Sequence, residues 1–337
     1  MTCYVRCTLA LATVLCLLMV FPVSALERIV ISTPGPRSLS FLPIDLIPKI
    51  GADREQGVAL QIIYTGSGAA SLRDLATRNT DFAIAGVPAA MSARLAGDDV
   101  MVIAPIDDAP IFVLMVRTDL QDQVKSIADL KGRVIAVNAS ASSRDTASKQ
   151  LARLLLEANG VSFDSVHIIP TGQNWHSVSA LILSGTADAI VGNEPFASRL
   201  KAAGLVFFLA NLAEPKTVQS IKGAHFLHAA LLTRNETIAQ TPEKVAKVVA
   251  MLQRSLDWLL HHTPEQVAET LGVTDPLERD SLILCLHKYP SAYSQNGRFS
   301  SAQLQETELF FHTSGGTSLP PLRLEDMVYD QWAGRSP

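Results

Sequence analysis

Cysteine is scarce in this chain, and its positions leave no pair that could form a disulfide in an exported protein. Of the four cysteines, Cys3, Cys7 and Cys16 lie in an N-terminal stretch that we expect to be removed. Cys285 stands alone in an apolar, helical context. A protein without disulfides depends on its packed core for stability. The residues that remain are numerous enough to build two domains with a core each.

Sequence motifs of several common enzyme classes are also missing. The chain contains neither G-x-S-x-G nor H-E-x-x-H, and the Gly-Lys dipeptide of a phosphate-binding Walker loop occurs nowhere. His225 and His228 in "HFLH" lie three residues apart on an expected strand, so their side chains would point to opposite faces and would not chelate a metal. These absences favour a binding protein without cofactor or metal, with an enzyme as the rival class.

An excess of positive charge is the third absence. The formal net charge is −4 at pH 7. Nucleic acids and acidic membrane surfaces are bound by basic faces. The charge therefore argues against either of them as a partner.

The first 25 residues have the pattern of a secretory signal peptide. Arg6 is followed by an apolar run from Leu9 to Val23, and the stretch ends in V-S-A. Such a run is shorter than the ~18 residues of a comfortable membrane span. We expect cleavage near Ala25 and export of the rest. An uncleaved N-terminal anchor is the alternative.

Apolar runs of strand length alternate with helical stretches from residue 28 onward. We expect strands at 28–33, 58–65, 82–86, 133–138, 166–172 and 188–193, and helices at 40–51, 69–78, 142–159 and 174–184. This alternation predicts an α/β fold with largely parallel sheets and crossover helices.

The second set of these elements repeats the first. The landmarks match in order and spacing: "RIVIST" at 28 with "RVIAVN" at 133, "IIYTG" at 62 with "IIPTG" at 168, and "DFAIAGVPA" at 81 with "DAIVGNEPF" at 188. A repeated supersecondary unit leaves such landmarks at a fixed period. We therefore expect two lobes of like construction.

The glycine-rich stretch "YTGSGAAS", residues 64–71, does not fit a nucleotide loop. Ser71 stands where the third glycine of the dinucleotide fingerprint belongs, and Asp81 precedes the next strand instead of ending it. The stretch predicts a turn at the carboxyl end of a strand, followed by a helix N-terminus with free N–H groups. Its counterpart is "PTGQNWHS", residues 170–177. If the lobes face each other, a ligand would bind between these two turns.

The chain changes character after residue 209. One further strand is expected at 226–234, and helices follow from Thr241, which is an N-cap candidate before Pro242. A helical tail has no sheet of its own on which to fold. We expect it to pack on the first lobe.

At this point the sequence resembles a known family. The motifs "GVALQIIYTGSGAASLRDLATRNTDFAIAG", "IADLKGRVIAVNASASS", "LILSGTADAIVGNEPFA" and "TPEKVAKVVAMLQRSLDWL" occur in family order over essentially the whole chain after residue 25. They resemble the periplasmic substrate-binding proteins of ABC importers, in the branch of nitrate, taurine and alkanesulfonate binders and NMT1/THI5-like proteins.

The resemblance implies a bilobal periplasmic-binding-protein fold of type II without catalysis. Residues 26–116 and 213–337 would form lobe 1 with the C-terminal helices, and residues 117–212 would form lobe 2. The protein would be periplasmic and monomeric, and would deliver a small polar or anionic ligand to an ABC permease in the inner membrane. A sensor that docks on a membrane receptor, or an enzyme related to pyrimidine synthesis, is the alternative.

The family's binding loops map onto carboxyl ends of strands in this sequence. The residues implied are Thr33, Arg37, Ser38, Gly66, Ser67, Gly68, Gly86, Val87, Asn138, Ser140, Ser142, Ser143, Gln173, Asn174, Trp175, Asn193 and Glu194.

Three residue types in these loops suggest ligand chemistry, each with a structural alternative. Trp175 would wall the ligand or pack under a loop, and Arg37 or Arg144 would pair with an anion or face solvent. Glu194 would meet an amino or ring N–H group, or face water at a helix N-terminus. A sulfonate, a carboxylate, a nitrate-like anion and an amino-pyrimidine all remain open as ligands.

Overall fold

The computed structural model describes residues 26–336 except 109, 139–145, 215–216, 218–222 and 315–321. The expected signal peptide therefore lies outside the described residues, as do Ser140, Ser142, Ser143 and Arg144. No helix in the described part combines the length and apolarity needed to cross a membrane.

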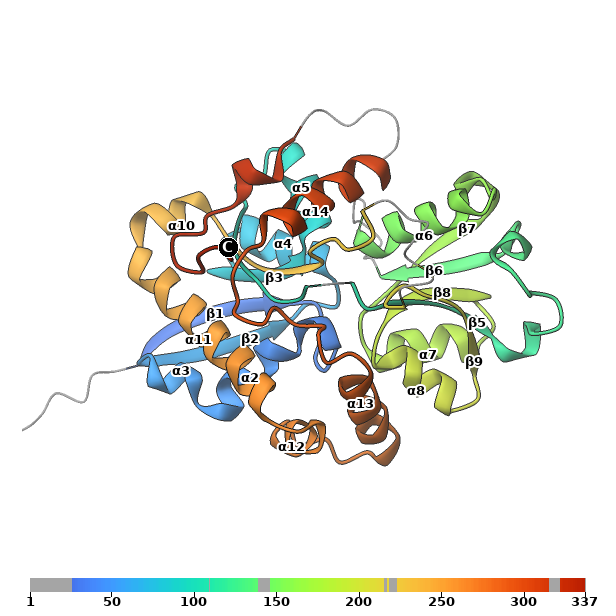
Figure 1. The fold of residues 1–337 in the computed structure, drawn as a ribbon, viewed down its shortest axis with the longest axis horizontal. Coiled ribbons are helices and arrows are strands. Elements are labelled where there is room, and N and C mark those ends of the chain that lie inside the picture. Colours follow the sequence, from blue (N-terminus) through green and yellow to red (C-terminus); the bar gives the residue numbers. More distant parts are fainter. Residues whose placement is uncertain are drawn as a thin grey trace, which may run out of the picture.

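Two five-stranded sheets form the centres of two lobes (Figure 1). The strands are β1 (Glu27–Thr33), β2 (Val58–Tyr64), β3 (Phe82–Gly86), β4 (Met101–Pro105), β5 (Phe112–Arg117), β6 (Val134–Asn138), β7 (His167–Thr171), β8 (Ala189–Asn193), β9 (Val206–Asn211) and β10 (Ala229–Thr233). We call the part built on β2-β1-β3-β10-β4 lobe 1 and the part built on β7-β6-β8-β5-β9 lobe 2.

The two sheets have the same topology, as the sequence repeat predicts. In lobe 1, β1 pairs in parallel with β2 and β3, and β10 runs antiparallel between β3 and β4. In lobe 2, β6 pairs in parallel with β7 and β8, and β5 runs antiparallel between β8 and β9. Each lobe thus receives its fourth strand from the chain that crosses from the other lobe.

The shared aspartates of the repeat have the same structural task in both lobes. The Asp81 carboxylate accepts a hydrogen bond from the Val30 N–H at 3.2 Å, and the Asp188 carboxylate accepts one from the Val134 N–H at 2.9 Å. Each aspartate therefore fixes the start of one strand against another strand of its own unit.

Helices cover both faces of each sheet. They are α2 (Leu42–Ile50), α3 (Ala52–Glu55), α4 (Gly68–Ala76), α5 (Val87–Leu95), α6 (Ala147–Ala158), α7 (Trp175–Leu183), α8 (Phe196–Ala202), α10 (Asn235–Gln240), α11 (Pro242–His261), α12 (Pro264–Thr270), α13 (Pro276–Lys288) and α14 (Ser301–Ser314). The apolar residues of the sheets and helices form one large core in lobe 1 and two clusters on the two sides of the lobe 2 sheet.

The C-terminal helices reach both lobes. As expected, α11 packs on α2 of lobe 1, whereas α13 also contacts α8 of lobe 2, and α14 contacts both α5 and α6. Figure 1 shows α13 and α14 at opposite margins of the gap between the lobes. Phe310 on α14 stacks on Phe226 with ring centroids 3.8 Å apart, within the lobe 2 core. Because this apolar side chain of α14 is buried in the lobe 2 core, the C-terminal helices do not pack on lobe 1 alone, in contrast to our expectation.

The first crossing between the lobes lies earlier than the expected division at residues 116 and 117. Val113 pairs with Gly192 on β8 and Asn211 on β9, so β5 lies wholly in the second sheet. The apolar run at 112–117 is compatible with either sheet. Only the pairing partners decide between them.

Candidate functional site

The stretch at residues 64–71 forms the expected turn and helix start in lobe 1. Gly66 has a φ of 87°, in the left-handed region that favours glycine. Ser67 is the N-cap of α4, and its Oγ accepts a hydrogen bond from the Ala70 N–H at 3.2 Å. Gly68 lies close to β3, because a Cβ added there would be 3.3 Å from the Ala85 Cβ. The glycines therefore bring the N-terminus of α4 against the end of the sheet.

Lobe 2 presents two helix N-termini of the same kind. Asn174 is the N-cap of α7 and accepts a hydrogen bond from the Ser177 N–H at 2.9 Å. Thr146 is the N-cap of α6, and its Oγ1 accepts from the Lys149 N–H at 3.3 Å. N-terminal N–H groups carry partial positive charge and favour anions.

A small cavity of about 20 Å³ lies between the lobes. The described residues that line it are Pro34, Phe41, Gly68, Ala69, Gly86, Ala89, Phe112, Asn138, Thr146, Ala147, Ser148, Gln173 and His228. They include the first residues of α4 and α6 and the N-cap of α5. A volume of this size holds about one water-sized group, so a larger ligand enters only when the lobes separate.

Backbone contacts hold the two lobes closed beside this cavity. The Gln173 N–H donates to the Gly66 carbonyl at 3.0 Å, which joins the two turns that the repeat made equivalent. The Leu39 N–H donates to the Glu194 carbonyl at 2.9 Å. Gly35 approaches the other lobe so closely that an added Cβ would be 2.2 Å from the Gln173 carbonyl oxygen. The loop after β1 and the turn at Gly66 in lobe 1 therefore meet the turn at Gln173 in lobe 2.

Several predicted residues carry buried polar atoms without a partner among the described residues. Asn138 donates to the Asn193 Oδ1 at 2.6 Å, which leaves Asn138 Oδ1 and Asn193 Nδ2 free. Gln173 is 8% exposed and its Oε1 is unpartnered. Thr33 Oγ1 and Ser38 Oγ are also buried and unpartnered. Asn138 and Gln173 line the cavity. Unsatisfied buried polar groups are costly, so the free amide oxygens of these two residues indicate a place where a polar ligand or water completes the bonding.

Of the predicted residues that the structure describes, Gly68, Gly86, Asn138 and Gln173 line the cavity, and Trp175 and Arg37 are among those that do not. The Trp175 ring packs on the lobe 2 core, and the Arg199 guanidinium covers it at 4.0 Å from the ring centre. Arg199 donates to Asp275 at 3.0 Å and to Glu278 at 3.1 Å, both on or next to α13. Arg37 also donates to Glu278. These side chains form an ion-pair cluster that joins the lobes.

Glu194 is buried and is absent from the residues that line the cavity. Its carboxylate accepts hydrogen bonds from the Ser198 N–H at 2.8 Å and the Ser198 Oγ at 2.9 Å. Burial raises the pKa of Glu194, and the bonds from Ser198 oppose this shift. The glutamate thus caps the start of α8 as an acid at a helix N-terminus does, but it does not face water. Val87, another predicted residue, does not line the cavity, and its N–H donates to the His228 carbonyl at 2.7 Å.

His228 is a cavity residue that the sequence reasoning did not select. Its Nδ1 lies 3.2 Å from Asp107 Oδ2, and Asp107 is fully buried. His228 lies just before β10, not within the longer strand we expected. It is the one ionisable side chain among the described lining residues. The motif "HFLH" did not indicate this role, because Asp107, the residue that orients the imidazole, lies 121 residues away in the sequence.

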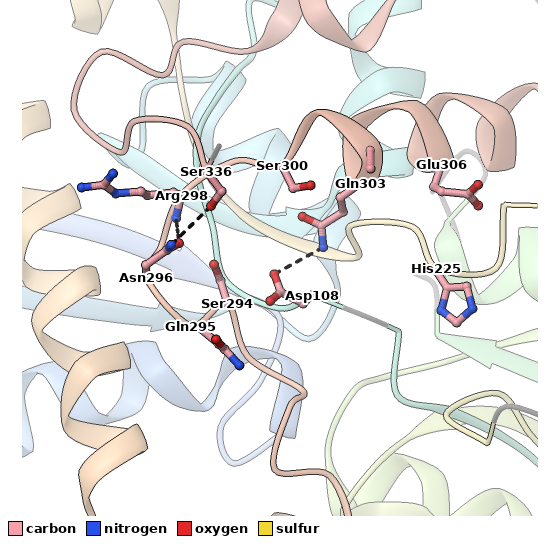
Figure 2. A pocket seen from close by; sticks show the side chains of 11 residues that line it. Asp108, His225, Ser294, Gln295, Asn296, Arg298, Ser300, Gln303, Glu306 and Ser336 are labelled. Carbon is pink, nitrogen blue, oxygen red and sulfur yellow. Dashed lines mark hydrogen bonds between the residues drawn. The ribbon is translucent and has the colours of Figure 1, made fainter.

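A more open cavity of about 390 Å³ lies elsewhere, where residues 294–300 meet the start of α14 (Figure 2). Figure 2 shows Gln303 directed toward Asp108, with its Nε2 3.4 Å from Asp108 Oδ1. Burial raises the pKa of Asp108. None of the residues described around this cavity comes from the repeated units, and no group of metal-ligating side chains occurs in the described part of the chain. The interlobe cavity is therefore the candidate site.

Comparison with known proteins gives partial sequence similarity and extensive structural similarity. A Brucella abortus (strain 2308) protein with the name "Putative binding protein" is 30% identical over 154 residues, which are 44% of this chain and 43% of that protein. The alkanesulfonate-binding protein SsuA from Xanthomonas axonopodis pv. citri, bound to MOPS, has a TM-score of 0.71 at 17% identity, covering 91% of this chain and 98% of that one.

A protein of different activity has the same fold. The desulfurization enzyme DSZB has a TM-score of 0.61 at 17% identity, covering 91% of this chain and 97% of that one. At such identities the structural matches establish the bilobal fold alone.

The family assignment comes from the sequence. The model described as "NMT1/THI5 like" matches residues 54–266. This range includes both turns, all of lobe 2, and β10, which returns the chain to lobe 1. Because the match covers more than half of the chain, the protein belongs to the NMT1/THI5-like family.

Proposed function

We propose that the protein is an extracytoplasmic solute-binding protein, which captures a small polar or anionic organic molecule between its lobes and delivers it to an ABC permease in the inner membrane. The observation that carries this proposal is the closed cavity between the lobes, to which each lobe contributes a helix start. Family membership and the fold shared with SsuA support it. The N-terminal pattern supports a periplasmic location, and we propose that the protein acts there as a monomer.

An anionic headgroup suits the cavity best. The N-termini of α4 and α6 line it, and Asn193 Nδ2, next to the lining residue Asn138, is an amide donor without a partner among the described residues. Phe41, Phe112 and Ala89 provide an apolar flank for a carbon chain. Such a combination of few polar groups on an apolar wall is typical of small-molecule sites. Among the open ligand classes we favour a sulfonate or a carboxylate.

Binding is supported over catalysis by the state of the nucleophile candidates. The Ser148 Oγ donates to the Val191 carbonyl at 2.7 Å and accepts from the Asn138 N–H at 3.1 Å. The Thr146 hydroxyl caps α6. Cys285 is fully buried, and burial raises the pKa of its thiol. A nucleophile needs an activating base and, for cysteine, a lowered pKa; the Cys285 pKa moves the other way although its thiol contacts the Glu194 carboxylate, and the hydroxyl of Ser148 is directed to a backbone carbonyl.

Ligand-dependent thermal stability tests the proposal. The chain without residues 1–25 would be melted with ethanesulfonate, an aliphatic carboxylate, nitrate and an amino-pyrimidine in turn. A ligand at a hundred times its Kd stabilises the folded state by about 2.7 kcal/mol, which corresponds to roughly 4 °C in Tm for a chain of this size. We expect such a shift for one of the two organic anions.

Two glutamine variants make the assay specific for the cavity. Gln173→Ala removes a buried amide from the cavity wall and should reduce the ligand-induced shift. Gln240→Ala alters an exposed side chain at the end of α10 and should leave it unchanged. If no ligand class shifts the Tm, or if both variants respond alike, the interlobe cavity is not the binding site.

A further inference from the structure

His228 is held at the cavity wall from several sides. Its carbonyl accepts from the Val87 N–H at 2.7 Å, and its own N–H donates to Asp107 Oδ1 at 3.1 Å. The imidazole meets the Phe112 ring edge-on, with centroids 4.7 Å apart and planes at 79°. Phe41 and Phe226 lie 6.0 and 6.2 Å away by the same measure. The ring therefore has a fixed place and orientation in an apolar collar.

Asp107 determines which nitrogen of His228 faces the cavity. Its Oδ2 lies 3.2 Å from Nδ1, and its Oδ1 accepts from the Ala229 N–H at 2.8 Å. A carboxylate in this position orients the Nδ1 proton toward itself. Nε2 makes no hydrogen bond to the described residues. It lies on the side of Gly86, where an added Cβ would be 3.6 Å from it. Gly86 thus keeps the approach to Nε2 open.

The charges around this pair are few. Asp107 is the carboxylate that contacts the imidazole, and the Tyr293 backbone bridges to Asp107 from the other side. The Asp108 carboxylate accepts from Gln303 Nε2, whose amide also contacts the Asp107 carbonyl. The phenylalanines around the ring bring no charge, and the first turn of α6 carries Lys149. With His228 protonated the buried pair is neutral overall, and an added anion meets a donor at Nε2.

We propose that His228 recognises the anionic group of the ligand through Nε2–H as an imidazolium, with Asp107 as its counter-charge, and that binding takes up a proton. This inference rests on the proposed function, since it concerns the same cavity. The proton comes from solvent and goes to Nε2, and no other bond changes. Affinity should therefore fall as the pH rises.

Titration calorimetry at pH 8 in phosphate and in Tris tests this, with ethanesulfonate and an aliphatic carboxylate as the probes. These buffers differ in ionisation enthalpy, so the difference between the two heats gives the number of protons bound. We expect an uptake approaching one proton per ligand in the wild type. His228→Gln should show no uptake and bind about tenfold to a hundredfold more weakly, because a charge-assisted hydrogen bond is lost. His176→Gln changes an exposed histidine of α7 and should behave as the wild type.

The outcomes separate this inference from the proposed function. Wild-type binding without proton uptake overturns the inference and leaves the function intact. Unchanged affinity and uptake in His228→Gln do the same. The wild-type measurement decides the matter even if that variant folds poorly. If neither anion binds to the wild type, the anionic ligand class itself is wrong, and this inference fails with it.

Discussion

Replacing Arg199 with methionine should weaken the closed arrangement of the lobes. Arg199 on α8 joins lobe 2 to Asp275 and Glu278 at the start of α13, which is anchored in the lobe 1 core through Leu282. The Arg199 side chain is 10% exposed and that of Glu278 14%. Methionine retains the apolar stem against Trp175 but removes the charge.

The magnitude follows from the burial of the partners. Breaking a buried ion pair costs about 3–5 kcal/mol. Asp275 is 51% exposed, so its bond contributes little, and Glu278 keeps the bond from Arg37. We therefore expect a loss of roughly 1.5–3 kcal/mol in the free energy of closing, which shifts the ratio of closed to open molecules by about tenfold to a hundredfold.

Small-angle X-ray scattering measures the population of open molecules, and urea unfolding checks that each lobe remains folded. Ligand-free Arg199→Met should have a larger radius of gyration than the wild type and should return to the closed profile on ligand addition. Arg254→Met is the control, since Arg254 pairs with Glu55 at 3.4 Å on the surface of lobe 1. Identical scattering of the Arg199 and Arg254 variants would refute the role of the cluster in closure.

Two further predictions concern the same region. Burial raises the pKa of Asp45 from its ordinary value near 3.8 to about 6. The folded state therefore binds the proton of Asp45 more tightly than the unfolded state, and this contribution to stability is lost as the pH rises from about 4 to 6. Asp45→Asn should remove about 3 kcal/mol of that decline, as measured by urea unfolding at pH 3.5 and 7; parallel pH profiles would contradict it. Gly35→Ala places a Cβ 2.2 Å from the Gln173 carbonyl oxygen and should prevent full closure, so that calorimetry shows at least about tenfold weaker ligand binding; unchanged affinity would mean that the loop yields.

The regular elements could be predicted closely because their signals are local. The strand at 82–86 was expected at its observed bounds, and the helix expected at 174–184 is α7, Trp175–Leu183. β10 begins at Ala229, three residues later than expected. The N–H groups of His228 and Ala229 bond to the Asp107 side chain at this point, which no periodicity reveals.

The candidate site was predictable in outline only. The turn residues Gly68, Gly86, Asn138 and Gln173 line the cavity, since carboxyl ends of parallel strands meet at one edge. Arg37 was expected to meet a ligand and instead pairs with Glu278, 241 residues away. A charged residue in a loop near the site suggests a contact with a ligand. Whether it contacts a ligand or another side chain depends on which helix packs beside the loop, here α13.

The sequence by itself determined the alternation of strands and helices, the duplication of the unit, and the turns that end its strands, because periodicity, capping residues and glycines act over a few neighbouring positions. Only the tertiary structure decided that β5 belongs to lobe 2, that α13 and α14 reach across to that lobe, and that His228 faces the cavity with Asp107 behind it. These outcomes depend on contacts between segments far apart in the chain. Their free energies come from burying apolar surface and pairing charge in a particular packing, which local patterns do not encode.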